Sequence, residues 1–219
     1  MQVKTKLKQA IAASVCTAVL LAPACVLTEH EDGIAVSVVL THRPAPSGAW
    51  PEGVTLDAAY VTVTGVEIVR CAEATSWHWT SVAYAHTQGT PTRLGVPAVE
   101  DLLAPAPTPR TLGVLHAPPG RYCSVRITLG PADADALGLE AAPGMRGKSA
   151  LLDGSLHSAC DREQIVDVTL AAPVEVSEDA RDAELLLQLD AATLFDGVDP
   201  GDEAGAACAA ATNVAHSIR

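Results

Sequence analysis

The stretch of residues 56–86 constrains the fold more than any other part of the chain. Its first part, residues 56–71, is rich in Val, Ile and Thr, and both faces of the extended pattern carry β-branched residues. Such a run is typical of a central β-strand covered on both sides. Two of the three tryptophans follow in residues 77–85, which the pattern predicts to be the returning strand of a hairpin.

Alternation of apolar and polar residues recurs along the chain and predicts further strands. These are expected at residues 33–41, 90–94, 112–116, 121–129, 150–156, 164–176 and 184–190. Turn-forming Pro and Gly separate the runs, most clearly at residues 118–120. We therefore expect an all-β fold, an antiparallel β-sandwich of about seven to nine strands with a short C-terminal helix.

Three segments depart from the strand pattern. Residues 97–103 have apolar residues at helical spacing and predict one or two turns of helix. Residues 133–147 are rich in Ala, Gly and Pro and predict an irregular excursion. Asp199 and Pro200 look like an N-cap and a first helical residue, so a helix is expected over residues 203–215.

The N-terminus has the layout of an export signal. Three lysines precede an uncharged run over residues 10–22, and small residues follow just before Cys25. This run is shorter than the ~20 residues that span a bilayer, and no later stretch reaches that length. The predicted organisation is a signal peptide (1–24), a tether (25–32) and a single β-sandwich domain (33–219).

Cys25 separates two processing routes. Ordinary cleavage would follow the Ala-x-Ala motif, whereas lipoprotein processing would leave Cys25 at the N-terminus carrying lipid. Bacterial lipoproteins usually have Leu three residues before this cysteine, where this chain has Ala22. Lipidation leaves an even number of cysteines, because Cys16 is removed with the signal. We therefore predict a membrane anchor on Cys25 and a location in the bacterial periplasm or at the outer membrane surface.

The four remaining cysteines suit two disulfides in an oxidising compartment. They are Cys71, Cys123, Cys160 and Cys208. Four cysteines allow three pairings, and sequence alone does not choose among them. Cys71 and Cys123 lie at ends of predicted strands and could bridge neighbours, in which case Cys160 takes Cys208 and ties the last helix to the sheet.

Charge and motifs exclude several function classes. Loss of three lysines and no acid with the signal changes the net charge from −12 to −15, which disfavours a nucleic-acid partner. No G-x-S-x-G nucleophile elbow is present. Gly147-Lys148-Ser149 lacks the earlier glycine of a phosphate loop, and the acidic turn at 133–138 lacks the final Glu of a calcium loop. We expect a protein that is not an enzyme.

The histidines suggest a metal hypothesis. Imidazole suits copper or zinc where thiols are tied up in disulfides, and the candidate ligands are His78, His86 and His116. In one unbroken strand, His78 and His86 would lie about 26 Å apart, so the chain must turn between them to share an ion. The competing interpretation is that Trp77 and Trp79 cover a sheet face and the histidines are ordinary surface groups.

Several stretches together resemble a known family. They are AYVTVTGVEIVR, PPGRYCSVRITLG, VDVTLAAPVEV and LLLQLDAATLFDG. They resemble the exported, copper-binding β-sandwich proteins of the methanobactin-associated MbnP-like family. They equally resemble a domain of unknown function of bacterial lipoproteins, in which a Gly-x-Tyr strand follows a segment like residues 100–103. The resemblance covers most of residues 54–197 and implies an exported β-sandwich with copper as the ligand.

The copper ligands of that family do not carry over to this chain. Thr64-Gly65 stands where the family carries His-Asp, and residues 132–135 stand where it carries Asn-His. A copper site here would have to be built from the candidate histidines named above. The sequence therefore supports two functional hypotheses: an exported binding protein for copper, and a surface interaction module for protein or glycan that uses Trp77 and Trp79 as anchors.

Overall fold

The computed structural model describes residues 33–72, 92–95, 97–105, 107–179, 183–199, 201–202 and 205–216. They belong to one unit, Glu31–Arg219. The elements in chain order are β1 (Ile34–Arg43), β2 (Leu56–Arg70), β3 (Arg93–Leu94), β4 (Ala98–Asp101), β5 (Arg110–Ala117), β6 (Gly120–Leu129), the 3-10 turn η1 (Pro143–Met145), β7 (Ala150–Gly154), β8 (Ser158–Cys160), β9 (Gln164–Val176), β10 (Ala183–Asp190), the 3-10 turn η2 (Ala191–Thr193) and α1 (Ala206–His216).

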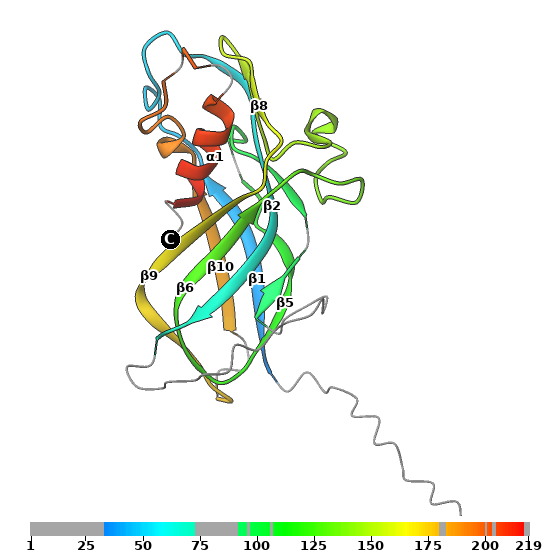
Figure 1. Ribbon diagram of the computed structural model, residues 1–219, viewed down its shortest axis with the longest axis vertical. Helices are drawn as coiled ribbons and strands as arrows, with labels where there is room; N and C mark the ends of the chain where they lie inside the picture. Colours follow the sequence, from blue (N-terminus) through cyan, green and yellow to red (C-terminus); the bar gives the residue numbers. More distant parts are fainter. Residues whose placement is uncertain are drawn as a thin grey trace, which may run out of the picture. The chain divides into compact units, whose positions relative to one another are not determined.

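Two sheets make up the fold, as the sequence predicts (Figure 1). The smaller sheet has the order β10-β1-β5, and the larger one joins the other seven described strands around β2. The predicted all-β sandwich with a short C-terminal helix is confirmed. The described part holds ten strands rather than seven to nine, and the two that the sequence did not predict are the short strands β4 and β8.

One strand pair departs from the antiparallel pattern. β1 pairs with β5 in antiparallel fashion, but with β10 in parallel, from Val36 opposite Ala183 to Arg43 opposite Asp190. Parallel neighbours need a long connection, and β1 and β10 stand near opposite ends of the sequence. Alternation within each strand cannot reveal such a pairing.

β2 is the spine of the larger sheet. Along one edge, its first part pairs with β7 and its second part with β6. Along the other edge it pairs with β4 and then with the short β3. The strand therefore has neighbours on both sides over much of its length, as its β-branched composition predicts.

A β-bulge in β2 changes which residues face the core. Val63 lies opposite Leu129 while Gly65 lies opposite Thr128, so Thr64 is an extra residue. Strict alternation would place Val66 on the face opposite to Val63. Because of the bulge, both are buried in the same core. Strict alternation therefore describes the two faces of β2 only up to residue 64.

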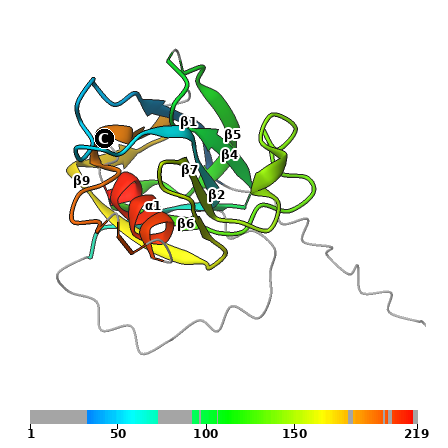
Figure 2. The same cartoon turned by 90° about the horizontal axis from the view of Figure 1, so that it is seen from above.

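The core lies between the two sheets. β1 contributes Val36, Val38 and Leu40 at alternate positions, and β6 contributes Val125, Ile127 and Leu129 from the facing sheet. Helix α1 adds a surface of small buried side chains and contacts β7, β8 and β9 (Figure 2). Small alanines allow the helix to approach the strands closely.

Two predicted helical segments differ from the structure. Within residues 97–103, Ala98–Asp101 is strand β4, since its residues pair with β2 and three of the four are buried. Burial against an available strand edge outweighs a weak helical pattern here. The last helix begins at Ala206, and the carboxylate of Asp202 accepts the backbone N–H of Gly205. Asp199 instead accepts the N–H of Gly201 in a turn.

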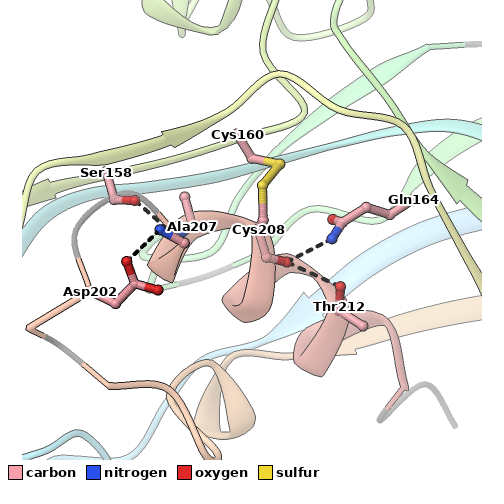
Figure 3. Close-up of a disulfide and its surroundings, with 8 residues drawn as sticks. Ser158, Cys160, Gln164, Asp202, Ala207, Cys208 and Thr212 are labelled. Atoms are coloured by element: carbon pink, nitrogen blue, oxygen red, sulfur yellow. Dashed lines mark hydrogen bonds between the residues drawn. A yellow bond between two sulfur atoms is a disulfide. The ribbon is translucent and has the colours of Figure 1, made fainter.

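Both disulfides link segments that the sheets bring together. Cys71 bonds Cys123, the extra residue of a second bulge in β6, and Cys160 in β8 bonds Cys208 in α1. The four predicted cysteines are thus all paired. Figure 3 shows the second disulfide, beside which the Ser158 hydroxyl accepts the N–H of Ala207.

Among the described helices, none is both long and apolar enough to cross a membrane.

Candidate functional site

The residues singled out by the sequence fall mostly outside the described part of the chain. Trp77, Trp79, His78 and His86 lie in residues 73–91, and Cys25 lies in residues 1–32, none of which are described. His116 is half-buried on β5, opposite Ala35 of β1. In the described ranges, no group of three or more His, Cys, Asp or Glu side chains is placed to hold a metal ion.

The described loops concentrate at one end of the sandwich. The segments after β1, after β4 and after β6 all leave the sheets at the end where α1 packs (Figure 1). The described residues of these segments are 44–55, 102–105, 107–109 and 130–149. Loops held by a rigid scaffold are the usual location of binding groups, so this loop end is the candidate functional region.

A buried polar pair, His42 of β1 and Glu100 of β4, lies where these strands lead into the loop end. His42, the last inward-facing residue of β1, places its Nδ1 2.7 Å from Oε1 of Glu100 in β4. Its Nε2 donates to the backbone oxygen of Ala104 at 2.9 Å. Both side chains are almost fully buried. The pair joins the two sheets and fixes the start of the proline-rich loop after β4.

The surroundings of His42 favour its protonated form. Burial is the largest influence and lowers the pKa. The hydrogen bonds to Glu100 and Ala104, with the negative charges of Glu100 and Asp101, outweigh it, so the pKa of His42 is raised above its usual value of 6.5. A proton on Nδ1 converts the contact into an imidazolium–carboxylate pair. A buried pair of this kind joins the sheets only while both partners are present.

A second ionic contact involves Arg43, which follows His42 at the end of β1. The guanidinium of Arg43 donates to the Asp190 carboxylate at the end of β10. Asp190 is nearly buried, and its other oxygen accepts the N–H of Ala192 at 3.1 Å, capping η2. The beginning of the loop after β1 is therefore attached to the end of β10.

Trp50 anchors the middle of the same loop. Its Nε1–H donates to the backbone oxygen of Ala191 at 3.4 Å. Its ring meets the Phe195 ring nearly edge to face, with centroids 6.2 Å apart. Trp50 is half-buried and is one of the residues that line a hollow of about 380 Å3.

The excursion after β6 encloses a larger hollow. Met145 and three alanines of residues 132–147 form a small buried cluster with Val99 of β4 and Leu151 of β7. The segment forms a bridge within itself, between Ala132 and Arg146, and a second one from Leu137 to Ala98 of β4. The hollow has a volume of about 660 Å3. Asp135, Glu140 and Arg146 supply its charged side chains. The predicted irregular excursion is confirmed, and it is an ordered loop rather than a linker.

Sequence reasoning missed His42, Glu100 and Trp50 as functional candidates. The alternation of β1 continues inward from Val36 through Leu40 to position 42, so it could have predicted a buried histidine. A buried histidine needs partners for both ring nitrogens, which is a signal for a nearby acid. The acid that contacts His42 is Glu100 because β4 pairs with β2. The sequence does not predict that pairing.

His42 and His157 each contact a carboxylate, in very different surroundings. His42 is buried at 1% exposure, away from solvent. His157 lies 2.9 Å from Asp153, and both side chains are exposed. Neither pair lines the two hollows of the loop end.

No family model matches this chain, and neither the curated proteins nor the solved structures contain a match. The resemblance to exported copper-binding β-sandwiches stays a prediction from sequence.

Proposed function

We propose that the chain is an exported binding protein without enzymatic activity, anchored to a bacterial membrane by lipid on Cys25. The observation that carries the proposal is the pairing of the cysteines. The four cysteines of the sandwich domain form two disulfides with each other. Cys16 and Cys25, both in the N-terminal segment, are the other two in the chain.

Disulfides persist outside the cytosol, so the two bridges support export. The domain also provides no partner for Cys25, since its own cysteines are all used. A free thiol next to an Ala-x-Ala motif would be exposed to oxidation, whereas lipid on that sulfur removes the problem. Attachment to a membrane would additionally need a second interaction or more than one acyl chain, which lipoprotein processing supplies.

The binding role is supported by the loop end. The hollow beside Trp50 lies on the loop after β1, and the buried His42–Glu100 pair and the Arg43–Asp190 contact attach the start of that loop to the sheets. The larger hollow lies on the loop after β6, whose apolar side chains pack with Val99 of β4 and Leu151 of β7. Preorganised loops of this kind bind ligands at a smaller entropic cost than flexible ones.

Replacing Cys25 with serine tests the anchor. In a Gram-negative host that exports the full chain, we expect the wild-type protein in the membrane fraction and Cys25→Ser in the soluble periplasmic fraction. Cys16→Ser is the matched control, because it changes the other cysteine that lies outside the domain and should leave the protein in the membrane fraction. Equal membrane recovery of Cys25→Ser and wild type would refute lipid anchoring.

Copper is a second candidate ligand, favoured by one observation. Every cysteine of the domain is in a disulfide, and Met145, its one thioether, is fully buried, so imidazoles are the donors there that suit a copper ion. The described residues do not form a copper site by themselves, so His116 would have to act with His78 and His86. The alternative role for residues 77–79 is an aromatic anchor for a protein or glycan, with Trp77 and Trp79 in contact.

Copper binding is tested by equilibrium dialysis of the metal-free mature protein against Cu(II). We expect one ion per chain with a dissociation constant below about 1 μM, and His116→Ala should weaken it at least about tenfold because one ligand is lost. The exposed His157→Ala is the control and should bind copper like the wild type. No uptake at micromolar copper would remove this candidate.

A further inference from the structure

We propose that the hollow around Trp50 binds a neutral sugar ring, with the indole as the stacking platform. The proposal names the ligand class of the binding protein proposed above and therefore rests on that function. It concerns the loop of residues 44–55, which connects β1 to β2.

The indole is fixed in orientation before any ligand arrives. The bond from Nε1 to the Ala191 oxygen holds one edge of the ring, and the contact with Phe195 restricts its tilt. Trp50 also packs against the main core, so part of the ring is unavailable to solvent. Trp50 is also one of the residues that line the hollow. Rigid aromatic groups supply contact area at a small entropic cost.

Two hydrogen-bonded turns, residues 46–49 and 51–54, flank Trp50 in the sequence. The N–H of Ala49 donates to the Pro46 oxygen and that of Val54 donates to the Pro51 oxygen, each at 3.1 Å. Each proline is the first residue of its turn, and its ring restricts the backbone φ angle there. Gly53 closes the second turn with a φ of 86°, a conformation that other residues rarely adopt. The shape of the hollow is thus set by the local sequence.

The polar groups of the hollow disfavour an anionic ligand. Ser47 offers a hydroxyl and Glu52 a carboxylate, both exposed, and the residues that line the hollow include no basic side chain. A sugar has an apolar face of C–H groups that packs on an aromatic ring, and hydroxyls that donate to a carboxylate. A phosphate or carboxylate ligand would meet Glu52 without a compensating cation.

Size distinguishes a sugar from a folded protein partner. At about 380 Å3, the hollow falls in the range of small-ligand sites. A stable protein interface would need roughly 800 Å2 from each partner, far more than one loop provides. The remaining competitor is a basic peptide whose cation lies over the indole beside Glu52.

The test uses the mature protein with Trp77 and Trp79 changed to phenylalanine, so that Trp50 is the only indole left in the chain. Chitotriose and cellotriose are the neutral sugar probes, and tri-arginine is the cationic probe. We expect a saturable change in Trp50 fluorescence with at least one trisaccharide and none with tri-arginine. Saturation with tri-arginine alone, or with none of the three probes, would overturn the proposal.

Variants measured by calorimetry locate the site. Trp50→Phe, which keeps an aromatic ring against Phe195, should weaken sugar binding about tenfold, and Glu52→Gln should weaken it about threefold. Glu52 is exposed, so its variant should fold like the wild type and keeps the test valid if Trp50→Phe is unstable. Unchanged affinity in both variants would place the sugar elsewhere and refute the proposal. The anchor is tested separately on Cys25, so failure of sugar binding leaves the export and lipidation proposal standing.

Discussion

Replacing Glu100 with alanine should lower the free energy of unfolding by about 3 kcal/mol. The substitution leaves Nδ1 of His42 without its partner at 1% exposure, in a region that water does not reach. It also removes a link between β1 and β4, and so between the two sheets. Urea unfolding followed by far-UV circular dichroism measures the change.

Two further variants separate the buried pair from a general effect of losing an acid. Glu100→Gln can donate an amide N–H to Nδ1 of neutral His42, so it should cost less than half as much as Glu100→Ala. Glu184→Ala removes an exposed carboxylate of β10 and should stay within about 0.5 kcal/mol of wild type. If Glu100→Ala were as mild as Glu184→Ala, the pair would not support the sheets.

The raised pKa of His42 adds a pH dependence to the same prediction. A raised folded-state pKa means that the folded protein binds this proton more tightly than the unfolded chain. The corresponding stabilisation is fully present below pH 6.5, the unfolded value, and is lost as the pH rises through the folded-state pKa. The wild type should therefore lose this stability above pH 6.5, and Glu100→Gln should lose less of it.

Removing the disulfide of α1 is the second change with a large expected effect. The bridge between Cys160 and Cys208 spans 48 residues, and a loop of that length predicts a loss of about 4 kcal/mol on Cys160→Ala/Cys208→Ala. Helix α1 is otherwise held by its small buried side chains and by single hydrogen bonds, from Ala207 N–H to Ser158, from Gln164 to the Cys208 oxygen and from Asn213 to the Asp196 oxygen. We expect the helix to detach before the sheets unfold, which amide hydrogen exchange of its backbone would detect.

The other disulfide provides the matched control. Cys71 and Cys123 are 52 residues apart, so Cys71→Ala/Cys123→Ala should cost a similar free energy. Its bridge lies between β2 and β6, away from α1, and the amides of α1 should keep their protection. Loss of protection in both double variants, or in neither, would contradict a local role for the Cys160–Cys208 bridge.

The sequence predicts well where hydrophobic alternation and local turns decide the structure. The strand at residues 164–176 has the predicted bounds, and the turn before Tyr122 lies where Pro and Gly place it. Hydrophobic alternation does not predict the structure where the choice of a neighbouring strand determines it. β4 is a strand because β2 offers an edge to it, and β10 lies parallel to β1 because chain connectivity allows it. Neither partner can be read from the residues of the strand itself.

The candidate site is less predictable than the fold for the same reason. His42 and Glu100 are 58 residues apart in sequence, and only the packing of the two sheets brings them together. Trp50 looks like a lone aromatic in a proline-rich loop until Ala191 and Phe195 are placed beside it. The disulfide pairing was one of three choices and became definite only through the bulge at Cys123 and the docking of α1 on β8.

The central claim is that this chain is an exported lipoprotein whose domain cysteines are all bridged. Intact mass spectrometry of the protein purified from an exporting Gram-negative host tests it most directly. The claim predicts a chain that begins at Cys25, carries the mass of a diacylglyceryl group with a further acyl chain, and does not react with a thiol reagent before reduction. A mature N-terminus without lipid, or a chain with four reactive thiols in its domain, would contradict it.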